Sequence, residues 1–513
     1  MLLTELVETS AAVGATRSRS AKTELLADAL CRADHDEVET VVAYLSGELR
    51  QRRTGIGWRT LQSLPPPAES PTLGVSQVHQ RLEQISLLNG PSSQVARADQ
   101  VEQLFALATP VEQDYLARLI SGEVRQGALD GVVVTAVAAA AAVPVAAVRR
   151  AVMLRGASGP VAAAALADGE AGLAEFALVV GQPLRPMLAA TAPDVDAGLA
   201  KVTAAGATLE VAVEWKLDGI RVQVHRRGDD VWVFTRSLDD ITARVPEIVA
   251  AARSLPVDSV VLDGEALALG PHGAALPFQQ TGSRTASSAD VETLRAQVPL
   301  STFFFDLLHL DGADLLDLPA AERVTRLREI APDELVVPRL VTDDAGRVRA
   351  FFADAVSRGH EGVVLKGLDA PYDAGRRGAS WVKVKPRHTL DLVVLAAEWG
   401  HGRRQGWLSN LHLGARDADT GEFVMLGKTF KGLTDAMLTW QTERLLELET
   451  SRSGHEVRVR PDLVVEVAFD GVQASPRYPA GMALRFARVL RHREDKAAAE
   501  ADTIDTVRAI HGR

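Results

Sequence analysis

The spacing of apolar residues divides the chain into a helical first part and a strand-rich remainder. Up to about residue 205, apolar side chains recur every three or four positions, as in LARLISGEVRQGAL, and alanine dominates residues 131–171. This period and this composition predict amphipathic helices. The segment SLPPPAESPTLG (residues 63–74) predicts a loop between helical blocks, and QPLRPMLAATAPDVD ends the helical part.

From about residue 209 the pattern changes to short β-rich runs separated by Gly and Asp turns. The first series predicts an α+β domain and contains LEVAVEWKL, RVQVHRR, VWVFTR, SVVLDGEALAL and TFFFDLLHL. A second series opens with LDLVVLAAEWG and continues with HLGARD, EFVMLGKTF and LVVEVAFD. Short strands at this spacing suit a small barrel such as the OB-fold. We therefore expect a multidomain protein: an all-α domain at 1–205, an α+β domain at 206–388 and a small C-terminal β-barrel, for which the OB-fold is one candidate, at 389–513.

Composition is typical of a soluble globular protein. The chain has 513 residues, more than one hydrophobic core usually serves, with 47% hydrophobic and 24% charged residues. Its one cysteine, Cys31, excludes an intramolecular disulfide and fits a reducing compartment. The N-terminus lacks a secretory signal pattern. The apolar stretch Val132–Val148 is mostly alanine, contains Pro144 and falls short of the roughly 20 residues of a membrane span. We expect a buried helical pair there, no membrane contact and a cytoplasmic protein.

The net charge of −11 argues mildly against nucleic acid as a partner. Phosphate binding, however, depends on where cations lie rather than on their total. Arginines are locally concentrated, and each group is either a DNA contact or a solvated face. The groups are Arg17 and Arg19; Arg50, Arg52, Arg53 and Arg59; and Arg485, Arg488, Arg491 and Arg493.

The segment EWKLDGIR (residues 214–221) carries the strongest indication of chemistry. Lys216 follows an apolar strand and precedes Asp218-Gly219, a turn that would hold its amine at the mouth of a pocket. A lysine nucleophile must be neutral to attack, which requires desolvation or neighbouring cations. Lys383 and Lys385 would supply those cations, since residues two apart on a strand share a face. Taken alone, this short motif is equally compatible with a surface lysine in a β-turn.

Seven segments in order resemble the motifs of the covalent nucleotidyltransferases, specifically ATP-dependent DNA ligases of the three-domain form found in bacteria and archaea. They are EWKLDGIR, TRSLDD (235–240), LDGEAL (262–267), FFFDLLHLDG (303–312), EGVVLK (361–366), RRGASWVKVK (376–385) and RFARVLRHREDK (485–496). The resemblance covers nearly the whole chain. It implies a helical DNA-binding domain, an adenylation domain and an OB-fold domain, with ATP and Mg²⁺ as cofactors and nicked duplex DNA as the partner of a monomer.

The resemblance also implies a role for each motif residue. Lys216 would be the nucleophile, and Glu214 would accept a hydrogen bond from the adenine amino group. Phe305 would stack on adenine while its neighbour Phe304 faces the core. The other assignments follow the same motifs: Arg221 and Arg236 to phosphate and ribose, Glu265 to ribose or metal, Glu361 to Mg²⁺, and Lys366, Arg377, Lys383 and Lys385 to a cationic wall. Asp263 would cap the turn before Glu265.

The C-terminal motif would orient the departing pyrophosphate through Arg485, Arg488 and Arg491. Ala487 departs from the family pattern, in which proline is expected. In the helical part, YLSGELRQRRTGIGW (44–58) and ISGEVRQGAL (120–129) resemble paired DNA-contact segments, although helix ends with exposed arginines explain them equally well.

Two other functions remain open at this point. An RNA ligase or an mRNA-capping guanylyltransferase shares the lysine motif, and the long helical region and the motif order favour a DNA ligase over both. A nick-binding scaffold without catalysis is the alternative of another class. Retention of Lys216, Glu361, Lys383 and Lys385 together speaks against it.

Overall fold

The computed structural model describes residues 1–51, 54–90, 93–124, 126–127, 130–206, 210–270, 273–286, 290–373 and 377–511. Contacts within the chain divide it into two compact units. The first unit comprises residues 1–190, 201–343 and 364–382, and the second comprises residues 191–200, 344–363 and 383–513.

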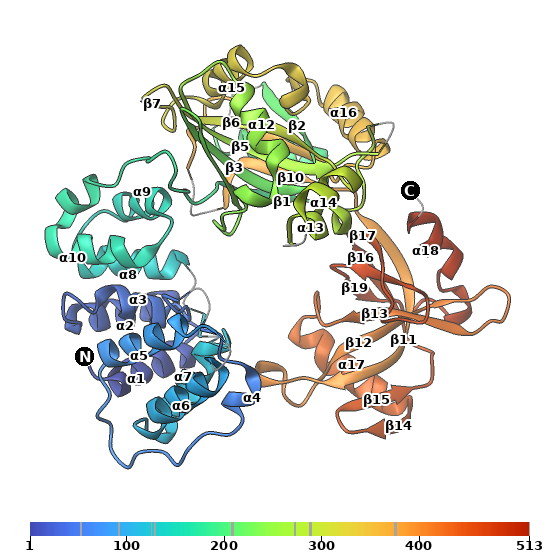
Figure 1. Ribbon diagram of the computed structural model, residues 1–513. Coiled ribbons are helices and arrows are strands. Elements are labelled where there is room, and N and C mark those ends of the chain that lie inside the picture. The colour runs from blue at the N-terminus through green and yellow to red at the C-terminus, as the bar shows by residue number, and fades with distance from the viewer. Residues whose placement is uncertain are drawn as a thin grey trace. The chain divides into compact units, whose positions relative to one another are not determined.

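Helices form the first part of unit one, as the apolar spacing predicts (Figure 1). Leu6, Val41, Leu82, Phe105 and Leu116 come from five of these helices and share one core. The helices are α1 (Leu3–Ala15), α2 (Arg19–Arg32), α3 (Val38–Leu45), α4 (Trp58–Leu61), α5 (Val75–Leu87), α6 (Ser93–Ala106), α7 (Pro110–Ile120), α8 (Asp130–Ala140), α9 (Val145–Arg155) and α10 (Ser158–Ala174).

The alanine-rich stretch forms a helical pair, which confirms that expectation. Helices α8 and α9 are separated by Ala142, whose φ of 51° is left-handed, and by Pro144, which directly precedes α9. A proline at this position cannot continue the first helix but is compatible with the start of the second. Within the described ranges, no helix is long and apolar enough to cross a membrane.

An antiparallel five-stranded sheet follows, in the order β4-β3-β5-β6-β7. One of its faces packs against helices α12 (Pro246–Ser254) and α15 (Ala320–Ile330), since Val222, Phe304, Ile248 and Leu327 share a core. The strands are β3 (Ile220–Arg227), β4 (Asp230–Thr235), β5 (Ser259–Ala268), β6 (Leu300–Leu310) and β7 (Ala313–Asp314).

A second five-stranded sheet has the order β1-β10-β9-β2-β8. Its first strand, β1, lies in the segment predicted only as a break after the helices. The sequence LAATA has weak β propensity, so this strand depends on its hydrogen bonds to β10 rather than on its own pattern. The strands are β1 (Leu188–Ala192), β2 (Val211–Lys216), β8 (Arg339–Thr342), β9 (Gly362–Gly367) and β10 (Arg377–Val384). Further helices are α11 (Val195–Thr203), α13 (Phe278–Ala286), α14 (Val291–Gln297) and α16 (Ala345–Ser357).

The C-terminal part of unit two is rich in strands, as predicted, and is built around the twelve-residue strand β11. One edge of β11 pairs with β12, and the other pairs with β16 near its start and β15 near its end. The pairing among the described strands does not close into a barrel. The elements are β11 (His388–Trp399), β12 (Leu408–Arg416), β13 (Phe423–Thr429), α17 (Asp435–Glu447), β14 (Glu449–Ser453), β15 (Glu456–Val459), β16 (Val464–Phe469), β17 (Gly471–Ala474), β18 (Met482–Arg485), β19 (Arg488–His492) and α18 (Ile504–His511).

His225 on β3 is fully buried and is held in its neutral form. Its Nδ1 accepts a hydrogen bond from the backbone N–H of Gly181 at 3.0 Å, and its Nε2 donates to Oε1 of Gln223 at 2.9 Å. Burial, with a smaller contribution from His309, lowers the pKa of His225 to about 3. A second proton would have to be placed on Nδ1, directly against a donor.

Acidification should therefore destabilise the fold. Because the pKa of an unfolded histidine is about 6.5, the unfolded chain binds a proton between pH 6.5 and pH 3 that the native chain does not. Stability then falls as pH decreases, by about 2 kcal/mol through His225 between pH 7 and pH 5. Denaturant unfolding at both pH values measures the loss. His225→Gln should show a smaller loss over this interval, and an equal loss in variant and parent would contradict the assignment.

Candidate active site

Lys216 is the last residue of β2 and is half-buried. The chain then bends through Leu217, Asp218 and Gly219 before β3 begins. A Cβ at Gly219 would lie 2.4 Å from the carbonyl oxygen of Ala266, so only glycine allows this bend to approach β5 so closely. The lysine is thus placed at a strand end next to a constrained bend, as the motif predicts.

Glu214 lies two residues before Lys216 and is buried. Its two carboxylate oxygens face two different cations: Oε1 is 3.0 Å from Arg339 Nη2, and Oε2 is 2.5 Å from Lys366 Nζ. Arg339 is the residue directly opposite Glu214 in the antiparallel pairing of β2 and β8. Two cations therefore compensate one buried carboxylate, which a buried charge requires.

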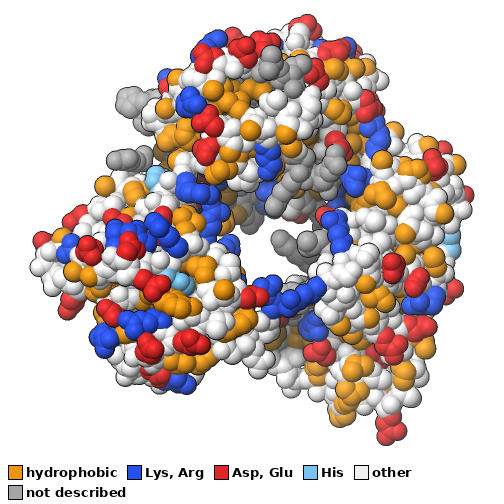
Figure 2. All heavy atoms as spheres, turned by 180° about the vertical axis from the view of Figure 1, so that it is seen from behind, with side chains coloured by type: hydrophobic (Ala, Val, Ile, Leu, Met, Phe, Trp, Pro, Cys, Tyr) orange, Lys and Arg blue, Asp and Glu red, His pale blue; other side chains and the backbone are white. Residues whose placement is uncertain are grey.

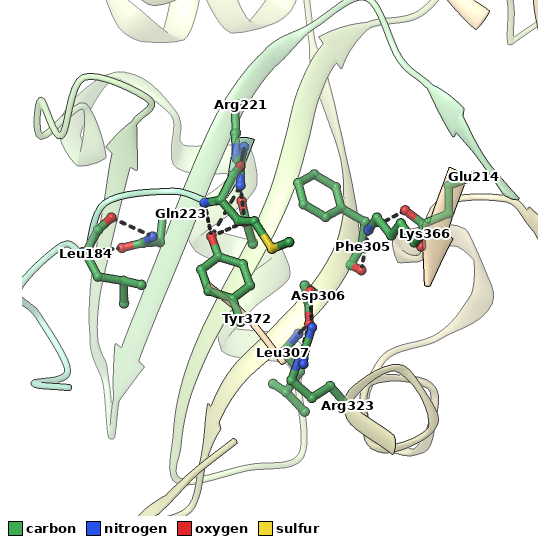
Figure 3. A network of polar contacts seen from close by, with 12 residues as sticks. Leu184, Glu214, Arg221, Gln223, Phe305, Asp306, Leu307, Arg323, Lys366 and Tyr372 are labelled. Carbon is green, nitrogen blue, oxygen red and sulfur yellow. Dashed lines mark hydrogen bonds and ion pairs between the residues drawn. The ribbon is translucent and has the colours of Figure 1, made fainter. Parts of the chain in front are cut away.

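Lys366 lies between Glu214 and Phe305 (Figure 3). Its ammonium lies 4.6 Å from the ring centroid of Phe305 and 4.1 Å from that of Trp381, and it donates to the Phe305 carbonyl at 3.3 Å. Burial lowers the pKa of Lys366, while Glu214 and Asp306 act in the opposite direction. The charge of Lys366 is thus matched by Glu214, and its place in the predicted cationic wall stays a prediction.

A β-bulge in β6 sets the direction of the Phe305 side chain. Phe304 is fully buried in the core and Phe305 is half-buried, which confirms that the two neighbours face opposite ways. The register of β5 with β6 shifts between Asp263 and Gly264, where Asp306 and Phe304 are their partners and Phe305 is the extra residue. Bulges of this kind re-aim a side chain next to active sites.

Asp263 and Gly264 do not form the predicted turn, because β5 runs through both residues. A Cβ on Gly264 would lie 2.9 Å from the carbonyl oxygen of Phe303, so the glycine allows close approach of β6. Glu265 is half-buried within the strand, opposite Arg221 on one side and Phe303 on the other. Sequence reasoning mistook the glycine for a turn residue when its role is packing.

Arg221 and Asp263 form a buried ion pair, and this corrects the interpretation of Asp263 as a turn cap. Arg221 donates to the two oxygens of Asp263 at 2.9 and 2.5 Å and to the Met187 carbonyl at 2.6 Å, and Tyr372 also donates to Asp263, at 2.8 Å. Although burial acts against it, Asp263 raises the pKa of Arg221 above its ordinary value. Contact of Arg221 with a nucleotide stays a prediction.

The remaining predicted residues lie in several places. Arg236 is exposed just after β4, Arg488 is exposed on β19, and Arg485 on β18 and Lys383 on β10 are half-buried. In unit two, Lys385 Nζ is 2.8 Å from Glu361, so the proposed metal carboxylate already holds a cation. The Arg377 side chain lies outside the described residues, as do Arg52, Arg53 and Arg125 of the predicted DNA-contact segments.

Comparison with known proteins places the chain in a family. Residues 186–385 match the family described as ATP dependent DNA ligase domain, residues 404–496 match the ATP dependent DNA ligase C terminal region, and residues 61–138 match the DNA ligase N terminus. A probable DNA ligase of a Nocardioides species is 61% identical over 100% of this chain and 99% of its own length. A probable DNA ligase of Beutenbergia cavernae is 60% identical over the full length of both chains. The chain belongs to the ATP-dependent DNA ligase family.

The fold of this ligase is also found in a solved structure, Pmar-Lig_PreS3. The two superpose with a TM-score of 0.62 over 95% of this chain and 99% of that chain, at 17% sequence identity. At that identity the likeness concerns the fold. It agrees with the succession of a helical region, a nucleotidyltransferase-like middle region and a strand-rich C-terminal region.

A second cluster with acidic residues lies in unit two of the ligase, and its central carboxylate is already hydrogen-bonded within the protein. Glu398, His412 and Glu456 are close enough together to hold a metal ion. Glu398, however, already accepts hydrogen bonds from the Lys428 ammonium, from His412 at 3.1 Å and from Asn410 at 2.7 Å. Partial burial acts to raise the pKa of Glu398, but these three donors lower it to about 2. This group is therefore best explained as an internal ion pair.

Sequence reasoning missed three residues that contact the predicted site residues: Arg339, Tyr372 and Trp381. Arg339 lies in no motif that the sequence made evident, and only the pairing of β8 with β2 brings it to Glu214. Trp381 could have been found, because it alternates with Lys383 along the same strand.

Removal of the Asp263 carboxylate should destabilise the ligase strongly. Asp263→Ala leaves Arg221 without its partner in a buried position, a change that costs about 3–5 kcal/mol. Asp317→Ala is a matched control, because Asp317 pairs with Arg150 on the surface and such pairs contribute about 1 kcal/mol or less. Denaturant unfolding measures both variants, and equal losses would show that the buried pair is not the stabilising one.

Proposed function

We propose that this ligase adenylates itself on Lys216 and then seals nicks in duplex DNA. The observation that carries the proposal is the placement of Lys216 at the end of β2, two residues after a buried carboxylate that is ion-paired next to Phe305. A strand end of this kind presents an amine and a base-binding surface within one short stretch of chain. The family's match over the middle region supports the same assignment.

The chemistry proceeds in three substitutions at phosphorus. The neutral Lys216 amine attacks the α-phosphate of ATP, the bond to the β-phosphate breaks, pyrophosphate leaves and a lysine–AMP phosphoramidate remains. The 5′-phosphate at the nick then attacks that phosphorus, forms a DNA–adenylate and releases the lysine. The 3′-hydroxyl finally attacks the activated 5′-phosphate, loses its proton and expels AMP as the phosphodiester forms. Positioning and charge stabilisation supply most of the catalysis in such transfers.

Each pocket residue has a role in this proposal. Glu214 accepts from the adenine amino group and Phe305 stacks on the base. Glu265 holds the ribose, since it lies beside Arg221 and Phe303 in the strand register. Arg221, Arg236, Arg377, Lys383 and Lys385 are the proposed cations for ribose and phosphate. Arg221 would combine that role with its structural pair to Asp263.

Glu265 and Glu361 are the proposed carboxylates for Mg²⁺. A carboxylate is the ligand type that this hard cation prefers, and at Glu361 the metal ion would replace the ammonium of Lys385. Bound Mg²⁺ would neutralise charge on the phosphates.

The DNA-binding part of the proposal depends on local charge. Lys and Arg side chains gather in patches on the face shown in Figure 2, although the whole chain is acidic. In unit two, the exposed rings of Phe430 and Phe486 are each accompanied by a cation: Arg404 lies 5.9 Å from the first ring and Lys431 lies 5.6 Å from the second. Such combinations of exposed aromatic rings and cations suit contact with bases and phosphates.

The proposal extends to the oligomeric state, the cellular location and the roles of the domains. We infer a monomer that acts in the cytoplasm, with a DNA-binding helical region, an adenylation domain and a C-terminal OB-fold. Short antiparallel strands around β11 support the OB-fold assignment. Relatives named as DNA ligases over the full length favour this activity over RNA ligation, capping or an inactive scaffold.

Lys216→Ala and Lys216→Arg should both abolish self-labelling by α-labelled ATP. Alanine removes the nucleophile, and the guanidinium of arginine stays protonated and cannot attack. Denaturing electrophoresis detects the labelled chain. Lys201→Ala, at an exposed position on α11, is the matched control and should label like the parent. Label on the Lys216→Ala chain would place the nucleophile elsewhere.

Arg488→Ala should slow adenylation more than it slows the sealing of pre-adenylated nicks. Arg488 is exposed on β19, and a role on departing pyrophosphate matters only while ATP is opened. Loss of one charged contact to a transition state should slow adenylation by about tenfold or more. Both rates are measured against Arg460→Ala, an exposed arginine of the same unit. Equal losses in the two assays would assign Arg488 to DNA binding or folding.

A further inference from the structure

The ion pair between Glu214 and Arg339 has unused hydrogen-bonding capacity. Both side chains are buried, and Arg339 Nη2 lies 3.0 Å from Glu214 Oε1. The angles are not those of a hydrogen bond. Among the described residues, Oε1 of Glu214 and both Nε and Nη2 of Arg339 have no hydrogen-bond partner. Buried polar atoms are rarely left in this state, and three of them occur here on two residues directly opposite each other.

The neighbouring cation does not account for these atoms. Lys366 lies against the other oxygen of Glu214, Oε2, and donates to the Phe305 carbonyl as well. Lys366 thus fixes the carboxylate and leaves Oε1 directed toward Arg339. The pair then offers one acceptor beside two donors, next to a ring that would stack on a base.

Adenine matches this arrangement when its amino group faces Glu214, and guanine held in the same pose does not. The adenine amino group is a donor, and on either side of it the ring offers an acceptor, N1 or N7. Guanine has the acceptor O6 in place of the amino group, and that oxygen would face the Glu214 carboxylate. An acceptor–donor pair in the protein therefore selects the base by its hydrogen-bonding pattern, and a mismatched base leaves buried groups unpaired.

We propose that Arg339 is a specificity-determining residue of the ligase: its guanidinium donates to the ring nitrogen adjacent to the adenine amino group while Glu214 accepts from that amino group. This inference rests on the proposed function, because it requires ATP to bind beside Phe305. It adds to that function a second residue that contacts the base and lies on β8, outside every motif identified in the sequence.

The test compares ATP with 1-deaza-ATP and 7-deaza-ATP, each of which replaces one ring nitrogen by a carbon. The rate constant kcat/KM for lysine–nucleotide formation is measured on the full chain by intact mass. The parent should prefer ATP over one of the two analogues by about tenfold, the effect of a hydrogen bond to a charged donor. The identity of that analogue shows whether N1 or N7 is read.

Arg339→Met should remove this preference, so that the ratio of ATP to that analogue approaches one. Its KM for ATP should rise while kcat is largely kept, because the contact concerns binding of the base rather than chemistry at phosphorus. Circular dichroism and denaturant unfolding of Arg339→Met check the fold, because the adenine of a pre-adenylated nick would occupy the same pocket. Arg326→Met on α15 is the matched control and should keep the parent's ratio.

Two results would overturn the proposal. One is a parent that uses ATP and both analogues equally well. This measurement uses the parent chain alone, so it remains a test even if Arg339→Met does not fold. The other is an Arg339→Met chain that keeps the parent's ratio. A parent that forms no adduct with ATP would instead refute the proposed adenylation itself, so the two failures are distinguishable.

Discussion

The candidate site of this ligase depends on one buried carboxylate and the two cations that compensate it. Glu214 is out of contact with water, and an isolated charge at that depth would not be tolerated. Arg339 and Lys366 come from β8 and β9, the strands next to β2 on its two sides. The charge balance of Glu214 therefore requires the sheet to assemble in this order, and it draws Lys366 over the ring of Phe305.

The same principle extends through the first unit. Arg221 with Asp263, and Arg323 with Asp306, are further buried pairs, and both are bidentate. Misplacement of either partner in such a pair is costly, because it leaves an uncompensated buried charge. Phe305 directly follows the buried Phe304 and directly precedes Asp306, so these two neighbours fix the bulge on its two sides.

The sequence alone predicted the order of the elements and the motif residues. It did not predict which strands and side chains pair with them. Alternation in TFFFDLLHL correctly separated Phe304 from Phe305, because burial alternates along β6 as far as Phe305. The strand β1 and the residue Arg339 escaped detection for a common reason. Each acquires its role only through pairing with a strand more than 100 residues away in the chain, β10 for the first and β2 for the second. The Asp263-Gly264 dipeptide was misread because glycine serves turns and close packing alike.

Strand β11 gives the second unit a particular order of assembly. It is paired along both edges, and its partner β16 begins more than 60 residues after β11 ends. Contacts of such long range form slowly, because a large loop must close before they contribute. The backbone amides of β11 are not protected from exchange until strands have paired along both of its edges. After pairing, these amides can open only when the unit unfolds as a whole. This strand should therefore exchange its amide hydrogens last and report the global stability of the unit.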